Sequence, residues 1–476
     1  MKRSCEYDAA VIGSGPNGLA AAITLAGRGL KVVVVEAAST AGGAARTEEL
    51  TLSGFRHDIG SAVFPMAAAS PFFSSLPLSR FGLEWIKPPV QMAHPFDDGR
   101  AALLKTSVTD SSLTLEGDEK AYAKLIQPMV DRFNGLRDYL LGARRFPQNP
   151  LPLTNFGLKA LSSAEYLSMS HFKGASARGF FAGAAAHSIL PLNKTPSAAF
   201  GLVLCTTGHA VGWPIPVGGA GSISLSLSRH FASLGGTLIT GHKVNSFTDL
   251  PDATALFFDT APRHLLRIYG ERLPTGYKRS LRNYRYGPGV FKLDWALSGP
   301  IPWKAEGCNQ AGAVHIGGTF SEIAEAEFSA WHGRLHSRPF VILAQPSLFD
   351  SSRAPSGRHT AWAYCHVPNG CSYDMTEAIE SQIERFAPGF KSLILQRHAS
   401  APADLEAGNP NLVGGDIVGG AQTLKQILCR PACSLTPYTT PLRNVYLCSA
   451  STPPGAGVHG MCGSHAASVH LKRLGI

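Results

Sequence analysis

The sequence predicts an α/β fold in which a parallel sheet with flanking helices forms one lobe, and an α+β lobe is inserted between its pieces. Three observations predict this fold. A strand, a glycine-rich turn, a helix and a second strand open the chain; a helix followed by short strands lies in its middle; and a strand followed by an Ala-rich helix closes it. The length of 476 residues leaves room for about three units of ordinary domain size.

The opening segment predicts a βαβ unit. Asp8–Ile12 is a short β run, Leu19–Ala26 is Ala-rich and helical, and Lys31–Val35 is a β-branched run typical of a strand buried on both faces. Gly27 and Gly29 follow the helix, where glycine commonly ends helices. The two strands are therefore expected to lie side by side and parallel.

Two later blocks continue the same lobe. In the middle of the chain we expect one helix and three short strands, at Ser222–Leu234, Thr237–Thr240, Lys243–Phe247 and Ala255–Asp259. Near the end, Asn444–Cys448 predicts a strand, and the stretch from about Val458 to Leu471 predicts a helix. Residues 1–79, 216–262 and 435–476 would then form a nucleotide-binding domain.

The intervening residues, 80–215 and 263–434, are expected to form the second, α+β domain. Its clearest elements are three strand-like runs and one helix, at Phe291–Leu297, Phe340–Ala344, Ala361–Cys365 and Met375–Phe386. Aromatic residues from both domains are candidates to line an apolar tunnel, although scattered aromatics more often belong to a core. They are Phe64, Phe72, Phe73, Phe180, Phe181, Trp213 and Trp295.

Composition excludes several classes of protein. Charged residues make up 16% and hydrophobic residues 44% of the chain, which is typical of a packed protein and not of a disordered one. The net charge of +10 comes from scattered Lys and Arg, so we expect no nucleic-acid partner. Because no uncharged run is a continuous apolar 20-mer, no segment is expected to cross a bilayer.

The cysteines and histidines carry no redox or metal motif. Nine Cys is an odd number, which indicates free thiols in a reducing, cytoplasmic compartment. The closest spacings, Cys365 to Cys371 and Cys429 to Cys433, are not C-x-x-C, so we expect buried, inert thiols at both. His332 and His336 lack the glutamate of a zinc helix, and we expect no metal.

The first glycine turn, Gly13-Ser14-Gly15-Pro16-Asn17-Gly18, fits the dinucleotide pattern G-x-G-x-x-G. Gly13 permits the tight turn, Gly15 lets a pyrophosphate approach the backbone, and Gly18 allows close packing of helix and strand. The helix that follows presents free N–H groups and the positive end of its dipole to the phosphates. A dinucleotide site is therefore predicted here.

Two features that follow this turn indicate which dinucleotide is bound. Glu36 ends the second strand, where a carboxylate can accept hydrogen bonds from a ribose diol and would repel a 2′-phosphate. Gly42-Gly43-Ala44-Ala45-Arg46-Thr47 comes next, and Arg46 can reach phosphates or a ribityl chain. Many flavoproteins have this extension, so the two motifs together favour FAD.

The sequence resembles the phytoene desaturase-related branch of the FAD-dependent, amine-oxidase-like oxidoreductases. The resemblance rests on AVIGSGPNGLAAAITLAGRGLKVVVVEAASTAGGAART, FRHDIGSAVFP and PVGGAGSISLSLSRHF, and above all on NPNLVGGDIVGGAQTLKQIL with NVYLCSASTPPGAGVHGMCGSHAA. It spans both ends of the chain and is closest to bacterial phytoene dehydrogenase-like proteins and the pyridine nucleotide-disulfide oxidoreductase domain-containing protein 2 group. It implies a Rossmann-like FAD-binding domain of the glutathione-reductase/amine-oxidase type.

The resemblance also implies specific FAD contacts. The pyrophosphate would lie along the first turn, the adenosine ribose at Glu36 and the adenine at the Val244 backbone, and the remaining residues would line the path to the flavin ring. The full set is Gly13, Gly15, Pro16, Asn17, Gly18, Glu36, Gly43, Arg46, Gly60, Ser61, Val244, Ser449, Gly457 and Val458. Many relatives have Gly-Asp where this chain has Ser449-Ala450, so the carboxylate that would hold the ribityl chain is absent.

Two sites are candidates for chemistry near the flavin. His459 is expected in the first turn of the last helix, whose N-terminus would stabilise negative charge on a reduced flavin. It is our candidate catalytic residue, against the alternative that it caps and packs the helix. Asp58, in the loop that leads to the ring, is expected to hold a backbone turn more readily than to act in acid–base catalysis.

The predicted activity is an FAD-dependent dehydrogenation. The family suggests a lipophilic carotenoid- or isoprenoid-like substrate that gives a hydride to the flavin, which would bring the protein into peripheral contact with a membrane surface. Only one G-x-G-x-x-G pattern is evident, so electrons would leave to oxygen or a quinone instead of a nicotinamide. A carotenoid ketolase, an amine oxidase and a non-catalytic FAD-binding interaction protein are the alternatives. A disulfide oxidoreductase is excluded, since the first lobe has no cysteine pair.

Overall fold

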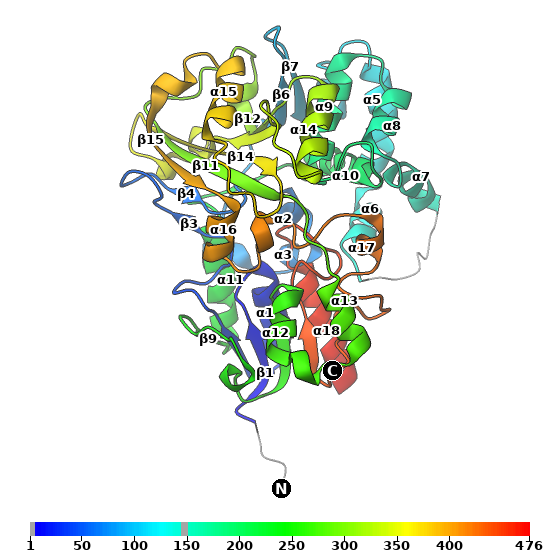
Figure 1. Cartoon of the computed structure of the whole chain (residues 1–476), viewed down its shortest axis with the longest axis vertical. Coiled ribbons are helices and arrows are strands. Elements are labelled where there is room, and N and C mark those ends of the chain that lie inside the picture. Colours follow the sequence, from blue (N-terminus) through cyan, green and yellow to red (C-terminus); the bar gives the residue numbers. More distant parts are fainter. Residues whose placement is uncertain (1–4, 144–150) are drawn as a thin grey trace.

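The computed structural model places the chain in two lobes joined by several crossing segments (Figure 1). It describes residues 5–143 and 151–476. Residues 1–4 and 144–150, which belong to the predicted ranges 1–79 and 80–215, lie outside the described residues. Among the helices of the described chain, none has both the length and the apolar character needed to cross a membrane.

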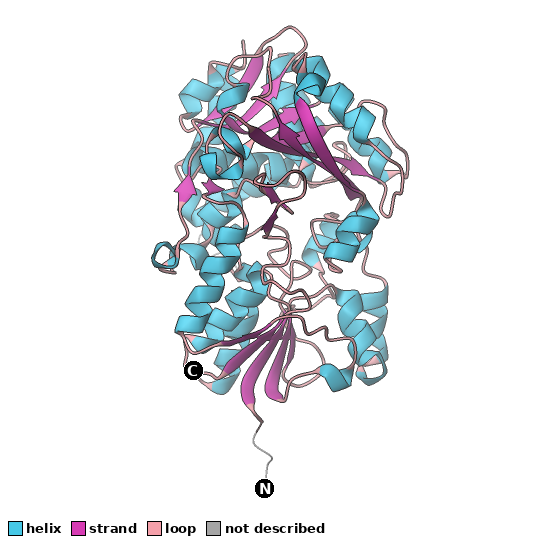
Figure 2. Ribbon diagram, turned by 90° about the vertical axis from the view of Figure 1, so that its left-hand side faces the viewer, coloured by secondary structure: helices cyan, strands magenta, loops and turns pink. Residues whose placement is uncertain are grey.

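A five-stranded sheet forms the centre of the lower lobe (Figure 2). Its strand order is β16-β10-β1-β2-β9, and every neighbouring pair is parallel. The strands are β1 (Tyr7–Ile12), β2 (Val32–Val35), β9 (Thr237–Ile239), β10 (Ala253–Phe258) and β16 (Val445–Leu447). Segments from the start, middle and end of the chain thus share one parallel sheet, which confirms the predicted fold class.

Alternate residues of the strands bury the two faces of this sheet, as the period of two in a strand requires. Ala9 and Val11 of β1 pack with α1 (Pro16–Ala26), α11 (Gly221–Ser233) and α18 (Met461–Leu474). The neighbouring residues of β1 face the opposite side, where α12 (Pro262–Tyr269) and α13 (Thr275–Arg282) cover the sheet. The sheet is therefore sandwiched between two layers of helices.

The last helix lies directly against the first (Figure 1). Gly463 of α18 makes this approach possible, because a Cβ there would come within 1.7 Å of the carbonyl oxygen of Asn17 in α1. The end of the chain is therefore packed beside the glycine turn at its start. This contact brings the closing motif and the opening motif to one place.

A seven-stranded mixed sheet forms the upper lobe (Figure 1). Its order is β15-β11-β14-β13-β12-β6-β7, in which only β12 and β6 are parallel neighbours. The strands are β6 (Val90–Pro95), β7 (Ala101–Lys105), β11 (Gly289–Leu297), β12 (Ala311–Ile316), β13 (Val341–Ala344), β14 (His359–Val367) and β15 (Ile394–Ser400). Two short ribbons, β3 (Thr47–Glu48) with β4 (His57–Asp58) and β5 (Trp85–Ile86) with β8 (Ile215–Pro216), complete the strands.

Helices bury both faces of the upper sheet. One face packs against α5 (Glu119–Val130), α8 (Ala164–His171), α9 (Ala175–Ala186), α10 (Ser197–Ala210) and α14 (Phe320–Trp331), and the other against α15 (Thr376–Phe386). The remaining helices are α2 (Pro65–Ala69), α3 (Pro71–Ser74), α4 (Val108–Ser112), α6 (Phe133–Leu140), α7 (Leu151–Ala160), α16 (Pro402–Gly408) and α17 (Leu424–Leu428).

The predicted strand at Lys243–Phe247 is wrong. The Asp249 carboxylate accepts hydrogen bonds from the amides of Asn245 and Ser246, at 2.9 Å each, and so draws this backbone into a cap for a short 3₁₀ turn. Four strands of the upper sheet, β6, β7, β12 and β15, were not predicted. The edge strand β15 is mostly polar, so its sequence carries little of the apolar signal of a strand.

Candidate active site

One cavity, called the central cavity below, lies between the two lobes. Its lower part is lined by loops at the carboxyl ends of the parallel strands, where α/β folds commonly bind ligands, and its upper part by the seven-stranded sheet. Nine of the predicted FAD contacts line it: Gly15, Pro16, Asn17, Gly43, Gly60, Ser61, Ser449, Gly457 and Val458. The cavity thus joins the opening and closing motifs into one site.

The first glycine turn has the backbone that its sequence predicts. Gly13 adopts φ +101°, a left-handed conformation that favours glycine. A Cβ on Gly18 would come within 2.1 Å of the Gly13 carbonyl oxygen, so a side chain cannot be placed there. Both glycines lie beneath the cavity floor and shape it, while Gly15 lies at its surface.

Asp259, which sequence reasoning missed, supports this turn from below. It follows β10, and its Oδ2 accepts a 2.8 Å hydrogen bond from the Gly18 amide. Burial raises the pKa of Asp259 to about 7, and the nearby charge of Glu36 adds to the rise. An acid that directly follows an apolar parallel strand was the available signal, because ligands meet this edge of the sheet.

Asn411, which sequence reasoning also missed, binds the backbone beside Asp259. Asn411 accepts a 2.8 Å hydrogen bond from the Ala261 amide and donates one of 3.2 Å to the Asp259 carbonyl. Asn409 and Asn411 both line the central cavity. They belong to the NPNLVGGD stretch, whose role the sequence did not reveal, and they fasten the upper lobe to the end of β10.

Besides Gly13 and Gly18, three predicted contacts are absent from the lining of the central cavity. Glu36 is buried; its Oε2 accepts from the amide and hydroxyl of Ser14, at 2.9 and 2.6 Å, and its Oε1 from the Ala38 amide at 2.8 Å. Arg46 has its Nε 3.4 Å from Glu48. Val244 packs with the helices on the far side of the sheet. The roles of Glu36 and Val244 at the adenosine end, and of Arg46 along the path to the flavin ring, remain predictions.

The closing segment is held by a buried arginine. Arg430 donates a 3.2 Å hydrogen bond to the carbonyl of Ala450 and a 3.0 Å hydrogen bond to Gln422. Its side chain is 1% exposed. The guanidinium therefore fixes the backbone at Ser449-Ala450, the position where the carboxylate of many relatives is absent.

His459 lies before α18 and not in its first turn, because the helix begins at Met461. The ring is fully buried, and Nδ1 accepts a 3.0 Å hydrogen bond from the Met461 amide. Burial lowers the pKa of His459 to about 4, so the ring is neutral. It does not line the central cavity. These contacts favour a capping role over the catalytic role that we predicted.

Lys292, also missed, is the one lysine or arginine of the chain's described part that lines the central cavity. It projects from β11 and forms a buried ion pair with Asp294. Burial raises the pKa of Asp294, and the charge of Lys292 opposes that rise. His57 lies 3.7 Å from Asp294, and burial lowers its pKa to about 3, so it contributes no positive charge.

The other ring-proximal acid has a structural role. Asp58 is fully buried and accepts hydrogen bonds from the Ala220 amide and the Thr47 hydroxyl at 2.8 Å. It also pairs with Arg353 at 2.7 Å. With these three partners, Asp58 joins the β3–β4 ribbon to the start of α11.

The upper part of the cavity is mainly apolar and aromatic. Of the predicted tunnel residues, Phe64 and Trp213 line it, whereas the other five aromatics pack in cores. Trp362 and Tyr364 of β14 also line it and stack with ring centroids 5.5 Å apart. His187, at the end of α9, adds a polar group. These three residues were not predicted.

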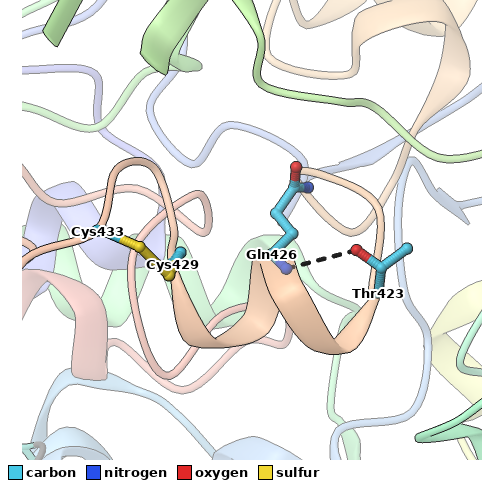
Figure 3. Close-up of a disulfide and its surroundings, with 4 residues drawn as sticks. All are labelled: Thr423, Gln426, Cys429 and Cys433. Atoms are coloured by element: carbon cyan, nitrogen blue, oxygen red, sulfur yellow. Dashed lines mark hydrogen bonds between the residues drawn. A yellow bond between two sulfur atoms is a disulfide. The ribbon is translucent and has the colours of Figure 1, made fainter. Parts of the chain in front are cut away.

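The prediction of free thiols at Cys429 and Cys433 is wrong, since the structure joins them in a disulfide (Figure 3). The chain turns back after α17, so the two Cα atoms lie 4.3 Å apart. The disulfide lines a separate surface groove and is absent from the lining of the central cavity. It closes the turn that carries Arg430.

The described residues contain no cluster of three or more His, Cys, Asp or Glu side chains arranged to hold a metal ion. The ring of His332 instead meets the Phe328 carbonyl at 2.8 Å.

Comparisons with known proteins agree with this geometry. A family model described as NAD(P)-binding Rossmann-like domain matches residues 11–76. The chain is 25% identical to the Rattus norvegicus pyridine nucleotide-disulfide oxidoreductase domain-containing protein 2, over 98% of this chain and 94% of that protein. It is 24% identical to the 4,4'-diapolycopen-4-al dehydrogenase of Metabacillus indicus, over 94% of this chain and 93% of that enzyme. Putrescine oxidase with bound putrescine has a similar structure, with a TM-score of 0.65 at 17% identity, covering 98% and 99% of the two chains.

These comparisons identify the chain as an FAD-dependent oxidoreductase that is similar to the amine-oxidase-like flavoproteins.

The site of this flavoenzyme fits FAD. Gly15 and Gly43 present backbone without side chains to the cavity, and the N-terminus of α1 points its free N–H groups there. The buried amide of Asn17 lines the same place with its Oδ1 unpartnered. A pyrophosphate would accept from these donors, since the oxygen and nitrogen of an amide are interchangeable in assignment.

Proposed function

We propose that this flavoenzyme dehydrogenates a lipophilic substrate, such as an isoprenoid or a polyene, in the upper part of the central cavity. The observation that carries the proposal is the lining of that part, which is apolar and aromatic and holds no acidic side chain. Asp259 is the only acid among the described residues that line the cavity, and it lies at the glycine turn.

Residues from both chain ends would hold the cofactor. The α1 N-terminus, Gly15 and Asn17 would bind the pyrophosphate, Ser449 the ribityl chain, and Gly457 and Val458 the ring. When bound, FAD supplies a two-electron acceptor for a hydride. The remaining chemistry belongs to the protein.

Lys292 would act beside the reacting atoms. Its side chain is 5% exposed and its amino group is held by Asp294, so Lys292 offers a fixed hydrogen-bond donor in a site from which water is largely excluded. A donor fixed in advance stabilises negative charge that develops during reaction more effectively than mobile water does. The surrounding aromatic rings would exclude solvent and orient the substrate.

Amine oxidation is the second candidate, because putrescine oxidase has the same fold. A protonated amine would enter a cavity whose upper lining offers no carboxylate to pair with it, and an unpaired charge in a buried site is unfavourable. This electrostatic argument favours the lipophilic substrate. We further propose oxygen or a quinone as the electron acceptor and peripheral contact with a membrane that supplies the substrate.

Anaerobic titration of the FAD-loaded protein tests the proposal. A panel of isoprenoids and polyenes in detergent micelles is compared with a panel of mono- and diamines, and loss of oxidised flavin absorbance is followed. We expect bleaching by at least one lipophilic compound and none by amines. Bleaching by amines alone would replace the proposal with amine oxidation, and stable FAD binding without reduction by either panel would favour a non-catalytic role.

A further inference from the structure

A row of side chains crosses the upper sheet from Lys292 to His315. In the strand register, Lys292 of β11 is opposite Tyr364 of β14, Tyr364 is opposite Ile342 of β13, and Ile342 is opposite His315 of β12. Residues directly opposite one another on neighbouring strands share a face of the sheet. The row spans three strand spacings, or about 14 Å.

A histidine pair marks the far end of this row. His187 lies over His315 from α9, with the two Nε2 atoms 3.0 Å apart. His187 lines the central cavity, as do Lys292, Tyr364 and Ile342. His315 is fully buried. The cavity therefore has one polar group beside the proposed reaction centre and another at the other end of an aromatic and aliphatic surface.

The hydrogen bonds of the pair assign the proton positions. Burial lowers the pKa of His187 to about 3 and that of His315 well below its ordinary value, so both rings are neutral. One Nε2 must donate and the other accept. Nδ1 of His315 is buried without a partner. A buried N–H without a hydrogen-bond partner is less favourable in free energy than a buried lone pair without one. His315 therefore has its lone pair on Nδ1 and its proton on Nε2, and it donates to His187.

His187 consequently carries its own proton on Nδ1. No side chain or backbone group of the described residues hydrogen-bonds that atom. The ring is held in place by His315 and by Trp213, whose ring centroid lies 6.1 Å away in an edge-to-face arrangement. A fixed, unpartnered donor thus faces an otherwise apolar end of the cavity.

We propose that His187 is a specificity-determining residue that binds an acceptor oxygen of the substrate, a carbonyl, hydroxyl or ether, about 14 Å along the sheet from Lys292. The inference rests on the proposed function insofar as it assumes a lipophilic substrate in this cavity. It adds that the substrate is an oxygenated lipid and not a plain hydrocarbon. A hydrocarbon would leave the donor unpaired in an apolar site, which disfavours its binding.

Equilibrium binding to the FAD-loaded protein tests this inference without turnover. The probes are all-trans-retinal and axerophtene, the hydrocarbon with a methyl group in place of the aldehyde, and binding is followed by quenching of tryptophan fluorescence. The wild-type protein should bind retinal about fivefold to tenfold more tightly than axerophtene, the range that one neutral hydrogen bond supplies. His187→Phe, which keeps the ring packing, should bring this ratio to about one, whereas His187→Gln, which keeps a donor, should retain part of it.

Equal affinities in the wild type, or an unchanged ratio in His187→Phe, would overturn the inference. The wild-type ratio decides the matter even if a variant fails to fold. His315→Phe, which removes the partner that orients His187, provides a second test and should also lower the ratio. If the ratio behaves as expected but no lipid reduces the flavin, the proposed function fails and the binding inference stands. If hydrocarbons reduce the flavin and retinal and axerophtene bind equally tightly, the binding inference fails and the proposed function stands.

Discussion

The Gly18 amide donates a 2.8 Å hydrogen bond to the carboxyl group of Asp259, although the two residues are 241 positions apart. The bond places an acid directly beneath the turn that would hold two phosphates. Burial raises the pKa of Asp259 to about 7, so the acid is about half protonated near neutral pH and largely protonated below it. A neutral acid can accept from Gly18 without repelling an anionic ligand.

Cofactor affinity should therefore depend on pH through Asp259. Above pH 7 the carboxyl group of the apoprotein ionises, and binding a dianion beside it requires a proton to be taken up. FAD affinity should fall up to tenfold for each pH unit above about 7. Asp259→Asn should remove this dependence. Isothermal titration calorimetry between pH 6 and pH 9 measures the FAD affinity of the wild type and of Asp259→Asn. An equal change of affinity with pH in the two proteins would contradict the account.

The same acid affects stability with a definite sign. Because its pKa is raised, the protonated form stabilises the fold fully below the ordinary pKa of aspartate, and this contribution is lost as the pH rises toward 7. The free energy of unfolding of the apoprotein should therefore decline less steeply with rising pH in Asp259→Asn than in the wild type.

Lys292 and Asp294 should have separable effects. Lys292→Met leaves the FAD contacts intact but removes the donor from the cavity, so the rate of anaerobic flavin reduction should fall about a hundredfold or more, with FAD content unchanged. It also leaves Asp294 buried without its cation, which should cost about 3–5 kcal/mol unless the acid takes up a proton.

The double variant Lys292→Met with Asp294→Asn is the matched control for this loss. It should recover the stability of the protein but not the rate of flavin reduction. Recovery of the rate by the double variant would mean that Lys292 acts only through folding.

Several buried histidines should make the fold sensitive to acid. Burial lowers the pKa of His57 to about 3 and of His94, His209 and His459 to about 4. Their neutral forms stabilise the fold fully above pH 6.5, and this stability is lost as the pH falls toward 4, at about 1.4 kcal/mol per pH unit for each group.

Denaturant unfolding at pH 7 and pH 5 should thus give a much lower midpoint at pH 5. His94→Gln should reduce the difference between the two midpoints, and His332→Gln, at an exposed position, should leave it unchanged. Identical midpoints at both pH values in the wild type would contradict the neutral assignments.

The sequence predicted the parts of the site in which the backbone itself makes the contact. In a glycine turn between two strands, the absence of side chains at Gly13, Gly15 and Gly18 permits the tight turn and the close approach of a ligand. The closing motif around Gly457 presents its backbone to the cavity in the same way. The cofactor and the fold class could therefore be predicted from the sequence alone.

Side chains that come together only through tertiary structure could not be predicted from the sequence. Lys292 lies in a strand-like run whose cavity-facing position depends on the register of β11 with β14, and His187 depends on the packing of α9 over β12. His459 shows the opposite situation. Its position next to a conspicuous motif suggested catalysis, but the helix starts two residues later and uses the ring as a cap.

The central claim is that glycine turns from both chain ends hold FAD in one cavity, and the flavin content of the purified protein tests it most directly. The wild type should bind FAD in equimolar amount. Gly15→Val should lose it, because a Cβ there lies 2.7 Å from Asp259 Oδ2 and the side chain would occupy the cavity floor. Gly276→Ala, in α13 with nothing within 4 Å of the added Cβ, should keep it. A wild-type protein that takes up no FAD, or a folded Gly15→Val variant that retains it, would contradict the account.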